Sequence, residues 1–308
     1  MSSRMQGYLF VLITMCIWGS FTILSRLNAE WHISAWDIAA LRFCIGFCIL
    51  MPILIVRGET AFLWKKEPFI LGLLGGVAYC LTAYSAFMYV PAAHAAIFLN
   101  GCIPLCTAVA GFLLFKQPLD KHIWISLIIM LTALVGMSVL MYEQTHVAFS
   151  FGDGLFFLAA IWWGCFTVLL KQWKLSAWQA MSGVAIWSAL IYIPIYICFL
   201  PKHLHEATLS HLMIQGIFHG VFVVIVATLS YIAAIERLGA FKAGSIVTLA
   251  PFIAAVVAVP LLNEPLSGAV VMGLVGMAIG ALQPWRWFHR KDALQAQLEK
   301  QKLKQLQK

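Results

Sequence analysis

Apolar residues fill long stretches of the chain, and short polar or charged segments separate these stretches. Each stretch holds roughly 20 residues, enough for a helix rising about 1.5 Å per residue to cross the roughly 30 Å apolar layer of a bilayer. We count ten such stretches, at residues 7–27, 35–56, 68–89, 91–114, 122–141, 153–171, 177–199, 211–235, 240–262 and 267–286. The pattern predicts an all-α integral membrane protein with ten transmembrane helices.

The second half of the chain repeats the pattern of the first. The pentapeptide that begins at Trp18, Trp-Gly-Ser-Phe-Thr, returns as Trp-Gly-Cys-Phe-Thr at Trp163, and residues 84–119 align without a gap on residues 231–266. Each half contains five predicted helices, so the second half enters the membrane from the opposite side. The sequence therefore predicts two inverted five-helix repeats, an arrangement that secondary transporters use for alternating access.

The repeat divides the chain into three parts. Residues 1–145 form the first five-helix repeat, residues 146–287 form the second, and residues 288–308 form a basic cytoplasmic tail. Leucines recur through the tail among lysine and glutamine residues, which is typical of a short amphipathic helix. We expect this helix to be solvated, with attraction to anionic lipids as the alternative.

Composition and charge agree with a membrane protein and orient it. The chain is 62% hydrophobic and 10% charged, whereas soluble domains average about 45–50% and about 25%. Lys and Arg gather in the loops on the side of both termini, while the other side has only Arg26 and Lys202. Basic loops stay in the cytoplasm, so we predict a bacterial-type inner (plasma) membrane protein with cytoplasmic termini. The expected partners are the lipid bilayer and a small-molecule substrate, with no nucleic acid.

The repeated Trp-Gly pairs lie near the middle of the first and sixth predicted helices. Trp18 and Trp163 would present flat apolar rings with one N–H donor at the depth where transporters bind substrate. Gly19 and Gly164, which have no side chain, would let a neighbouring helix or a ligand come close. Two interpretations remain open for this motif, substrate binding and helix packing.

Prolines interrupt the fourth and ninth predicted helices. Pro104 frees the carbonyl of Asn100, and its repeat counterpart Pro251 lies near Thr248. Freed carbonyls in the membrane must be satisfied within the protein or line a wet cavity. Asn100 and Thr248 are therefore candidate substrate-binding residues, with hydrogen bonds that stabilise their own helices as the alternative.

Polar side chains within membrane spans are costly, so each is a candidate for function. His94 begins the fourth helix, and Gln215 and His219 share one face of the eighth helix. Histidine exchanges a proton near neutral pH, so His94 or His219 is a candidate for proton coupling or gating. Tyr79 and Tyr84 are candidates for substrate binding, with ordinary interfacial packing as the alternative.

Arg42 is the charge that lies clearly within a predicted span. We expect a structural or gating pair with Asp37, its nearest acid in the sequence, with capture of a substrate carboxylate or snorkelling as alternatives. No Asp or Glu lies deep in any predicted span. This disfavours a multidrug mechanism based on a buried glutamate and lowers the expectation of a cationic substrate.

Motifs for metal, cofactor and enzymatic chemistry are absent from the sequence. Cys44/Cys48 and Cys102/Cys106 have a spacing that suits two soft metal ligands, but no Met-rich or His-rich loop accompanies them. The segment His-Glu-Ala-Thr-Leu that ends at Leu209 is not H-E-x-x-H, and no Walker A sequence occurs. We therefore expect no metal, no cofactor and no enzyme, and we expect transport powered by a gradient.

Several motifs together resemble the drug/metabolite transporter superfamily, specifically its EamA-type ten-helix members. These motifs are Trp-Gly in the first helix, Leu-Arg-Phe at residues 41–43, a proline within helices four and nine, and Glu-Pro-Leu at residues 264–266 before a helix of small residues. In the first half, Gln117 stands where the family commonly has an acid. The resemblance implies an inner-membrane exporter of amino acids or related small metabolites, as a monomer or homodimer. The alternatives are proton-coupled drug efflux in the same fold, a membrane receptor or assembly factor, and an intramembrane enzyme.

Overall fold

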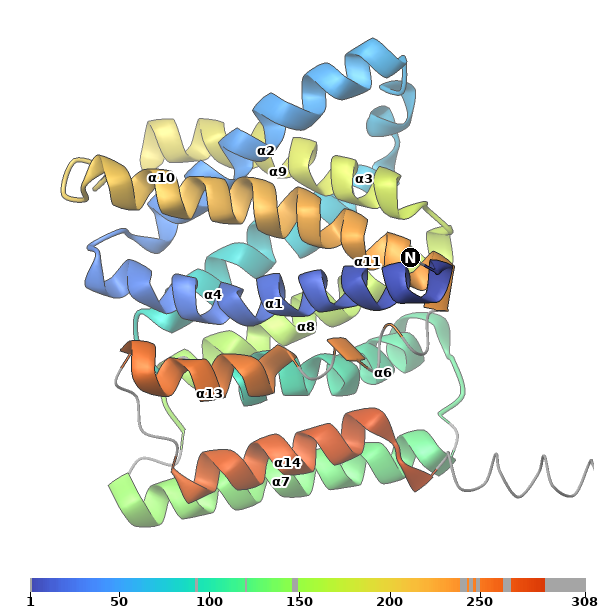
Figure 1. Ribbon diagram of the computed structural model, residues 1–308, viewed down its shortest axis with the longest axis vertical. Helices are drawn as coiled ribbons and strands as arrows, with labels where there is room; N and C mark the ends of the chain where they lie inside the picture. Colours follow the sequence, from blue (N-terminus) through green and yellow to red (C-terminus); the bar gives the residue numbers. More distant parts are fainter. Residues whose placement is uncertain are drawn as a thin grey trace, which may run out of the picture.

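The computed structural model describes residues 2–91, 94–119, 121–145, 149–238, 243, 246–247, 250–262 and 267–285. Throughout these residues the regular structure is helical, and the long helices run side by side along a common direction (Figure 1). Within the described part, eight helices are long and apolar enough to cross a membrane, and Gly268–Gly280 is a shorter apolar helix. The prediction of an all-α membrane fold is confirmed.

The described helices occupy the positions of the predicted spans. In the first half they are α1 (Ser3–Glu30), α2 (Ala35–Arg57), the continuous α3 (Lys66–Leu71), η2 (Gly72–Ala78) and α4 (Tyr79–Phe87), then η3 (Ala95–Gly101) with α6 (Cys102–Phe115), and α7 (Lys121–Thr145). In the second half they are α8 (Phe151–Trp173), α9 (Ala177–Phe199), the continuous α10 (Leu209–Ile217), η4 (Phe218–Ala227) and α11 (Thr228–Leu238), then α13 (Ala250–Leu262) and α14 (Gly268–Leu282). A short 3₁₀ helix, η1 (Ala61–Trp64), links α2 to α3.

Helix contacts reveal the relation between the halves. α2 packs along α9 and α7 packs along α14, so each pair joins corresponding helices of the two repeats. α1 contacts α11 and α13, while its counterpart α8 contacts α4 and α6, which are the counterparts of α11 and α13. Exchanging the halves therefore maps one set of contacts onto the other. In Figure 1 the α7–α14 pair lies at the bottom and α2 and α9 lie near the top, with α1 and α8 between them. The two inverted repeats are confirmed.

The glycines of the repeated Trp-Gly motif are packing positions in both halves. A Cβ atom on Gly19 would lie 3.3 Å from the carbonyl oxygen of Ala250 in α13. A Cβ on Gly164 would lie 2.8 Å from the backbone carbon of Cys106 and 2.9 Å from the backbone nitrogen of Thr107 in α6. The glycines thus let α1 approach α13 and α8 approach α6. The packing interpretation holds for Gly19 and Gly164.

The two ends of the bundle are named here by the residues that mark them. The Asp37 end is where α1 finishes and α2 begins, and the Arg57 end is where α2 finishes and α3 begins. Helices α2, α8, α10 and α14 start at the Asp37 end and receive side-chain N-caps, from Ser34, Ser150, Thr208 and Ser267 respectively. Most of the largest fully buried side chains, among them Tyr84, Phe87 and Phe156, belong to helix segments near the Asp37 end. That end is closely packed.

Among the described residues, three spans contain a π-helical segment. η2 in the third span and η4 in the eighth occupy corresponding places in the two repeats, and η3 precedes Pro104 in the fourth span. A π-helical turn widens the helix and shifts the direction of the side chains that follow, which is why such turns are frequent at functional sites. His219 lies in η4 and Asn100 lies in η3.

Candidate functional site

Three predicted residues from different helices form one buried hydrogen-bonded chain. Arg42 of α2 donates through Nη1 to the hydroxyl oxygen of Tyr84 in α4 at 3.2 Å, and this hydroxyl lies 3.0 Å from Nδ1 of His219 in η4. Arginine only donates, so the Tyr84 hydroxyl accepts from Arg42. The hydroxyl oxygen has a second lone pair, so whether it donates to His219 Nδ1 or accepts from it depends on the imidazole tautomer. The tautomer in which Tyr84 donates to Nδ1 carries the imidazole proton on Nε2, and it is the one that gives the Tyr84 hydrogen an acceptor. We call these three residues the Arg42 cluster.

The expected Arg42–Asp37 pair is wrong, since Arg42 is hydrogen-bonded to Tyr84 and Asp37 has other partners. Asp37 accepts hydrogen bonds from the Tyr196 hydroxyl, from Ser34 Oγ at 2.6 Å and from the His203 backbone N–H at 3.2 Å. The physical reason is helical position. Asp37 reaches back to its N-cap, while Arg42, five residues later, lies roughly 140° further round the helix at about 100° per residue.

The loop between α9 and α10, whose His203 backbone N–H donates to Asp37, contains an ion pair of its own. His203 Nδ1 lies 2.7 Å from Glu206 Oε1 in the segment between α9 and α10. The Glu206 carboxylate raises the pKa of His203 through this hydrogen bond, and the same bond lowers the pKa of Glu206. Both side chains are largely exposed, so this pair is not part of the buried site. It orders the loop whose backbone N–H donates to Asp37.

Buried polar atoms without a partner occur in the Arg42 cluster and on the neighbouring helix α1. Within the described residues, His219 Nε2 and Gln215 Oε1 are buried and make no hydrogen bond. Gln215 uses its amide Nε2 to reach the Leu24 carbonyl of α1 at 2.8 Å. Further along α1 toward the Asp37 end, the Ser25 hydroxyl and both amide atoms of Asn28 are also buried and unpaired among the described residues. Such atoms are costly unless a ligand or water satisfies them.

Close packing of α2 against the eighth span brings Arg42 to the same depth as His219 and Gln215. A Cβ on Gly220 would lie 2.7 Å from Ile45 Cβ and 3.5 Å from the Arg42 carbonyl oxygen, and a Cβ on Gly216 would lie 2.8 Å from Ile45 Cδ1. Glycine at these two positions removes the side chains that would hold the helices apart. The guanidinium and the unpaired atoms thus belong to one region.

The aromatic candidates form two groups deeper in the bundle. The Trp163 ring lies 4.6 Å from the Tyr79 ring and 5.0 Å from the Phe166 ring, measured between centroids. Trp18 lies 5.3 Å from Tyr231 of α11. Both tryptophans are half-buried, and neither indole N–H has a hydrogen bond among the described residues. Their flat faces and N–H groups are therefore available to a ligand.

Asn100 and Thr248 have different outcomes. The Asn100 side chain is half-buried, and it makes no hydrogen bond to any described residue. Among the described residues there is no kink-stabilising hydrogen bond from Asn100, and its role in substrate binding stays a prediction. Thr248 lies outside the described residues.

His94 lies apart from the Arg42 cluster, in a buried pair with an acid that sequence reasoning overlooked. His94 Nδ1 lies 2.7 Å from Asp153 Oδ1, and the two side chains are 10% and 1% exposed. The other carboxylate oxygen, Oδ2, accepts from the backbone N–H and the hydroxyl of Ser150, each at 2.9 Å. This pair joins the start of the fourth span to the start of α8, and hence the two repeats, at the Asp37 end. The Ser-x-x-Asp capping sequence was the signal that would have located Asp153.

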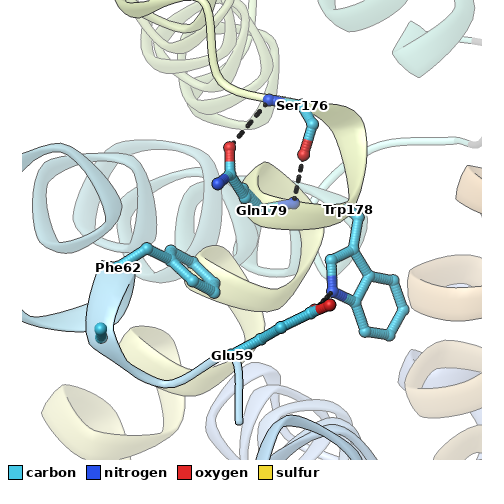
Figure 2. Close-up of a pocket in the computed structure, with 6 residues that line it drawn as sticks. Glu59, Phe62, Ser176, Trp178 and Gln179 are labelled. Atoms are coloured by element: carbon cyan, nitrogen blue, oxygen red, sulfur yellow. Dashed lines mark hydrogen bonds between the residues drawn. The ribbon is translucent and has the colours of Figure 1, made fainter. Parts of the chain in front are cut away.

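A cavity of about 340 Å³ lies at the Arg57 end, away from these residues (Figure 2). Its polar groups are already engaged, since Trp178 Nε1 donates to Glu59 at 2.8 Å and Ser176 and Gln179 cap α9 reciprocally. The Arg57 guanidinium stacks 5.1 Å from the centroid of the Trp178 ring. This cavity is part of the joint between α2 and α9, and it presents no group in need of a ligand.

A groove of about 400 Å³ lies nearer the Arg57 end, between α6, α7, α8 and α14, and Pro104, Thr107, Thr167 and Lys171 are among its lining residues. The threonine hydroxyls donate to carbonyls of their own helices, Thr107 to Ile103 and Thr167 to Trp163. It contains none of the substrate-binding residues predicted from the sequence.

The described architecture is that of a helical membrane transporter built from two inverted repeats, with unpaired polar groups buried between them. The sequence matches the EamA-like transporter family over residues 5–139 and 150–283. The chain belongs to that family, and hence to the drug/metabolite transporter superfamily.

Two similar proteins agree with this classification. A Clostridium kluyveri protein described as an uncharacterized transporter is 22% identical over 292 residues, which cover 90% of this chain and 92% of that protein. A solved crystal structure with 18% sequence identity superimposes with a TM-score of 0.61 and covers 92% of this chain and 95% of its own. The second likeness concerns the fold alone.

Proposed function

We propose that the protein is an inner-membrane secondary transporter that exports amino acids or related small metabolites by alternating access. The observation that supports this most is the Arg42 cluster, in which α2, α4 and η4 bring a charge, a hydroxyl and an imidazole together within the bundle. A soluble core avoids such groups, and a membrane protein keeps them where a polar solute must bind. Transport draws on a gradient, because the sequence has no ATP-binding motif.

In this proposal the substrate lies between the Arg42 cluster and the aromatic group around Trp163. Tyr79 and Tyr84 both belong to α4, so one helix connects the two groups. Trp163, Trp18 and Asn100 supply a flat face and hydrogen-bonding groups, while His94 and His219 are the candidates for coupling to protons. The described state has its Asp37 end closely packed, and transport requires that end to open in turn with the other.

The central site is tested by transport measurements on matched variants. Trp163→Ala and Asn100→Ala should each reduce export with normal expression and folding, by roughly tenfold in affinity for the tryptophan, since stacking contributes up to about 1.5 kcal/mol beyond area burial. Trp64→Ala is the control, since this tryptophan is 77% exposed at the link between α2 and α3. The measurements are metabolite efflux from overexpressing and deleted cells, then uptake into proteoliposomes. Wild-type kinetics in both central variants would move the site elsewhere.

The orientation of the bundle is a separate prediction. The distribution of Lys and Arg places the Arg57 end in the cytoplasm. Cysteine labelling or reporter fusions in whole cells should therefore find His203 outside, and Lys66 and Lys308 inside. A fusion at Lys308 that reports the external side would contradict the topology of an odd number of helices in each repeat.

A further inference from the structure

We propose that Arg42 anchors the carboxylate of the transported solute, with His219 as a second donor and Gln215 as the acceptor for the solute's ammonium group. The proposal rests on the transport function proposed above and names the chemistry of its substrate site. The proposal requires a carboxylate on the transported solute. Export of small metabolites in general does not require one.

The first argument is the missing counter-charge. Arg42 is 8% exposed, and among the described residues it donates one hydrogen bond, to Tyr84, although a guanidinium has five N–H donors. The ionisable side chains that act on it are Tyr79, Cys80, Tyr84 and His219. None of these carries a carboxyl group, and among the described residues no carboxylate forms an ion pair with Arg42. A buried cation without an anion is strongly unfavourable, so the arrangement needs one.

The second argument is the polarity of the unpaired atoms. In the tautomer that gives the Tyr84 hydrogen an acceptor, the proton of a neutral His219 lies on Nε2, so this buried unpaired atom is a donor. Gln215 Oε1 is an unpaired acceptor, because its amide nitrogen is held by the Leu24 carbonyl. Donors beside Arg42 suit a carboxylate, and an acceptor beside them suits an ammonium group, so the set matches a zwitterion.

The charge balance distinguishes a carboxylate from a phosphate. One guanidinium neutralises one carboxylate, whereas a phosphate dianion would leave a negative charge uncompensated in the membrane interior. Arginine also binds a carboxylate through two parallel hydrogen bonds, which fixes the orientation of the solute. The charge balance therefore fits a monocarboxylate, and the unpaired Gln215 Oε1 acceptor is what favours an amine on the same solute.

The residues that correspond to Arg42 and His219 in the other repeat are not polar, so the described part of the bundle contains no second copy of this anchor. Ser34-Ala35-Trp36 recurs as Ser176-Ala177-Trp178, so Arg42 corresponds to Val184 in α9. Extending the alignment of the second repeat segment gives Gly72 as the counterpart of His219. In the structure Val184 packs 3.4 Å from the Cβ position of Gly76, in the same span as Gly72. The carboxylate is thus held in the half nearer the Asp37 end and has no equivalent site in the other half.

The test measures whether the ligand's carboxylate binds to Arg42. Purified protein in detergent is titrated with each proteogenic L-amino acid, the carboxamide and decarboxylated amine of the best binder, and inorganic phosphate, with melting temperature as the readout. In the wild type, the carboxamide should bind about tenfold to a hundredfold more weakly than the acid, the loss of a charge-assisted hydrogen bond. In Arg42→Gln, acid and carboxamide should bind equally. Arg57→Gln, the same change at the other end of α2, should keep the wild-type ratio.

Three results would overturn the anchor. They are an unchanged acid-to-amide ratio in Arg42→Gln, stabilisation by phosphate but by no carboxylate, and a folded wild type that none of the probes stabilises. Should Arg42→Gln not fold, Arg42→Lys keeps the charge without the paired geometry and should show a reduced ratio. Arg42-dependent binding without transport in proteoliposomes would refute the proposed export and leave the anchor. Transport with an unchanged ratio would refute the anchor and leave the export.

Discussion

Gly164→Ala should destabilise the protein by about 1–3 kcal/mol, the usual cost of forcing an extra carbon into a close-packed interface. The added Cβ would lie within 3.0 Å of Cys106 and Thr107 atoms, two of them backbone atoms that cannot rotate away. Helices α6 and α8 must then separate, and this shift moves Trp163, the preceding residue. We expect a lower melting temperature in detergent and a loss of transport that exceeds the loss of folded protein.

Gly19→Ala is the matched control at the equivalent position of the first repeat. Its Cβ would lie 3.3 Å from the Ala250 carbonyl oxygen and 3.5 Å from Ile253 Cγ2, so a small shift accommodates it. We expect destabilisation below about 1 kcal/mol, as for a substitution that causes little strain. Equal effects of the two substitutions would show that the packing of the two halves differs less than the distances indicate.

Much of the fold follows from the sequence because the bilayer leaves few alternatives. Apolar stretches of about 20 residues must be helices, since every backbone group has to be satisfied within the span. The repeated Trp18 and Trp163 motifs and the odd number of helices in each half then give the inversion. The π-helical segments were not predicted, because a π-turn changes the backbone hydrogen bonding without altering the apolar pattern that a sequence displays.

The candidate site was predicted residue by residue but not as an arrangement. Arg42, Tyr84 and His219 were each proposed because polar groups are costly in a span. Their contact depends on how three helices pack, and spacing along the chain carries no information about that. The nearest acid in sequence, Asp37, was therefore a poor guide to the partner of Arg42, since five residues place the two side chains on different faces of α2.

The buried acids also show where sequence reasoning stops. Asp37 and Asp153 lie at helix starts, where the sequence pattern predicts an exposed capping residue. In the structure they are 0% and 1% exposed, because the tyrosine at the end of α9 covers the first and His94 covers the second. Burial of a cap depends on the neighbouring helix, so only the packed structure identifies these carboxylates as contacts between helices.

Asp153→Ala should have the largest effect on the Asp37 end. It removes the carboxylate that lies 2.7 Å from His94 Nδ1 in a buried pair. It also removes the side chain that caps α8 reciprocally with Ser150. Breaking a buried pair by deleting one partner costs about 3–5 kcal/mol. Because the pair joins the two repeats, we expect both a large fall in melting temperature and increased labelling of cysteines introduced near this end, since a buried polar contact between the repeats is lost.

Asp153→Asn separates the charge from the hydrogen bonds. Asparagine has one carbonyl oxygen, so it keeps an acceptor for either His94 or Ser150 and places an NH2 group at the other. Its melting temperature should therefore lie between those of the wild type and Asp153→Ala. In a double-mutant cycle with His94→Gln, the effects of Asp153→Asn should be clearly non-additive, because the two side chains share one contact. If the cycle is additive and labelling is unchanged, the pair does not hold the repeats together, and the closed Asp37 end depends on the apolar packing around Phe87 and Phe156 instead.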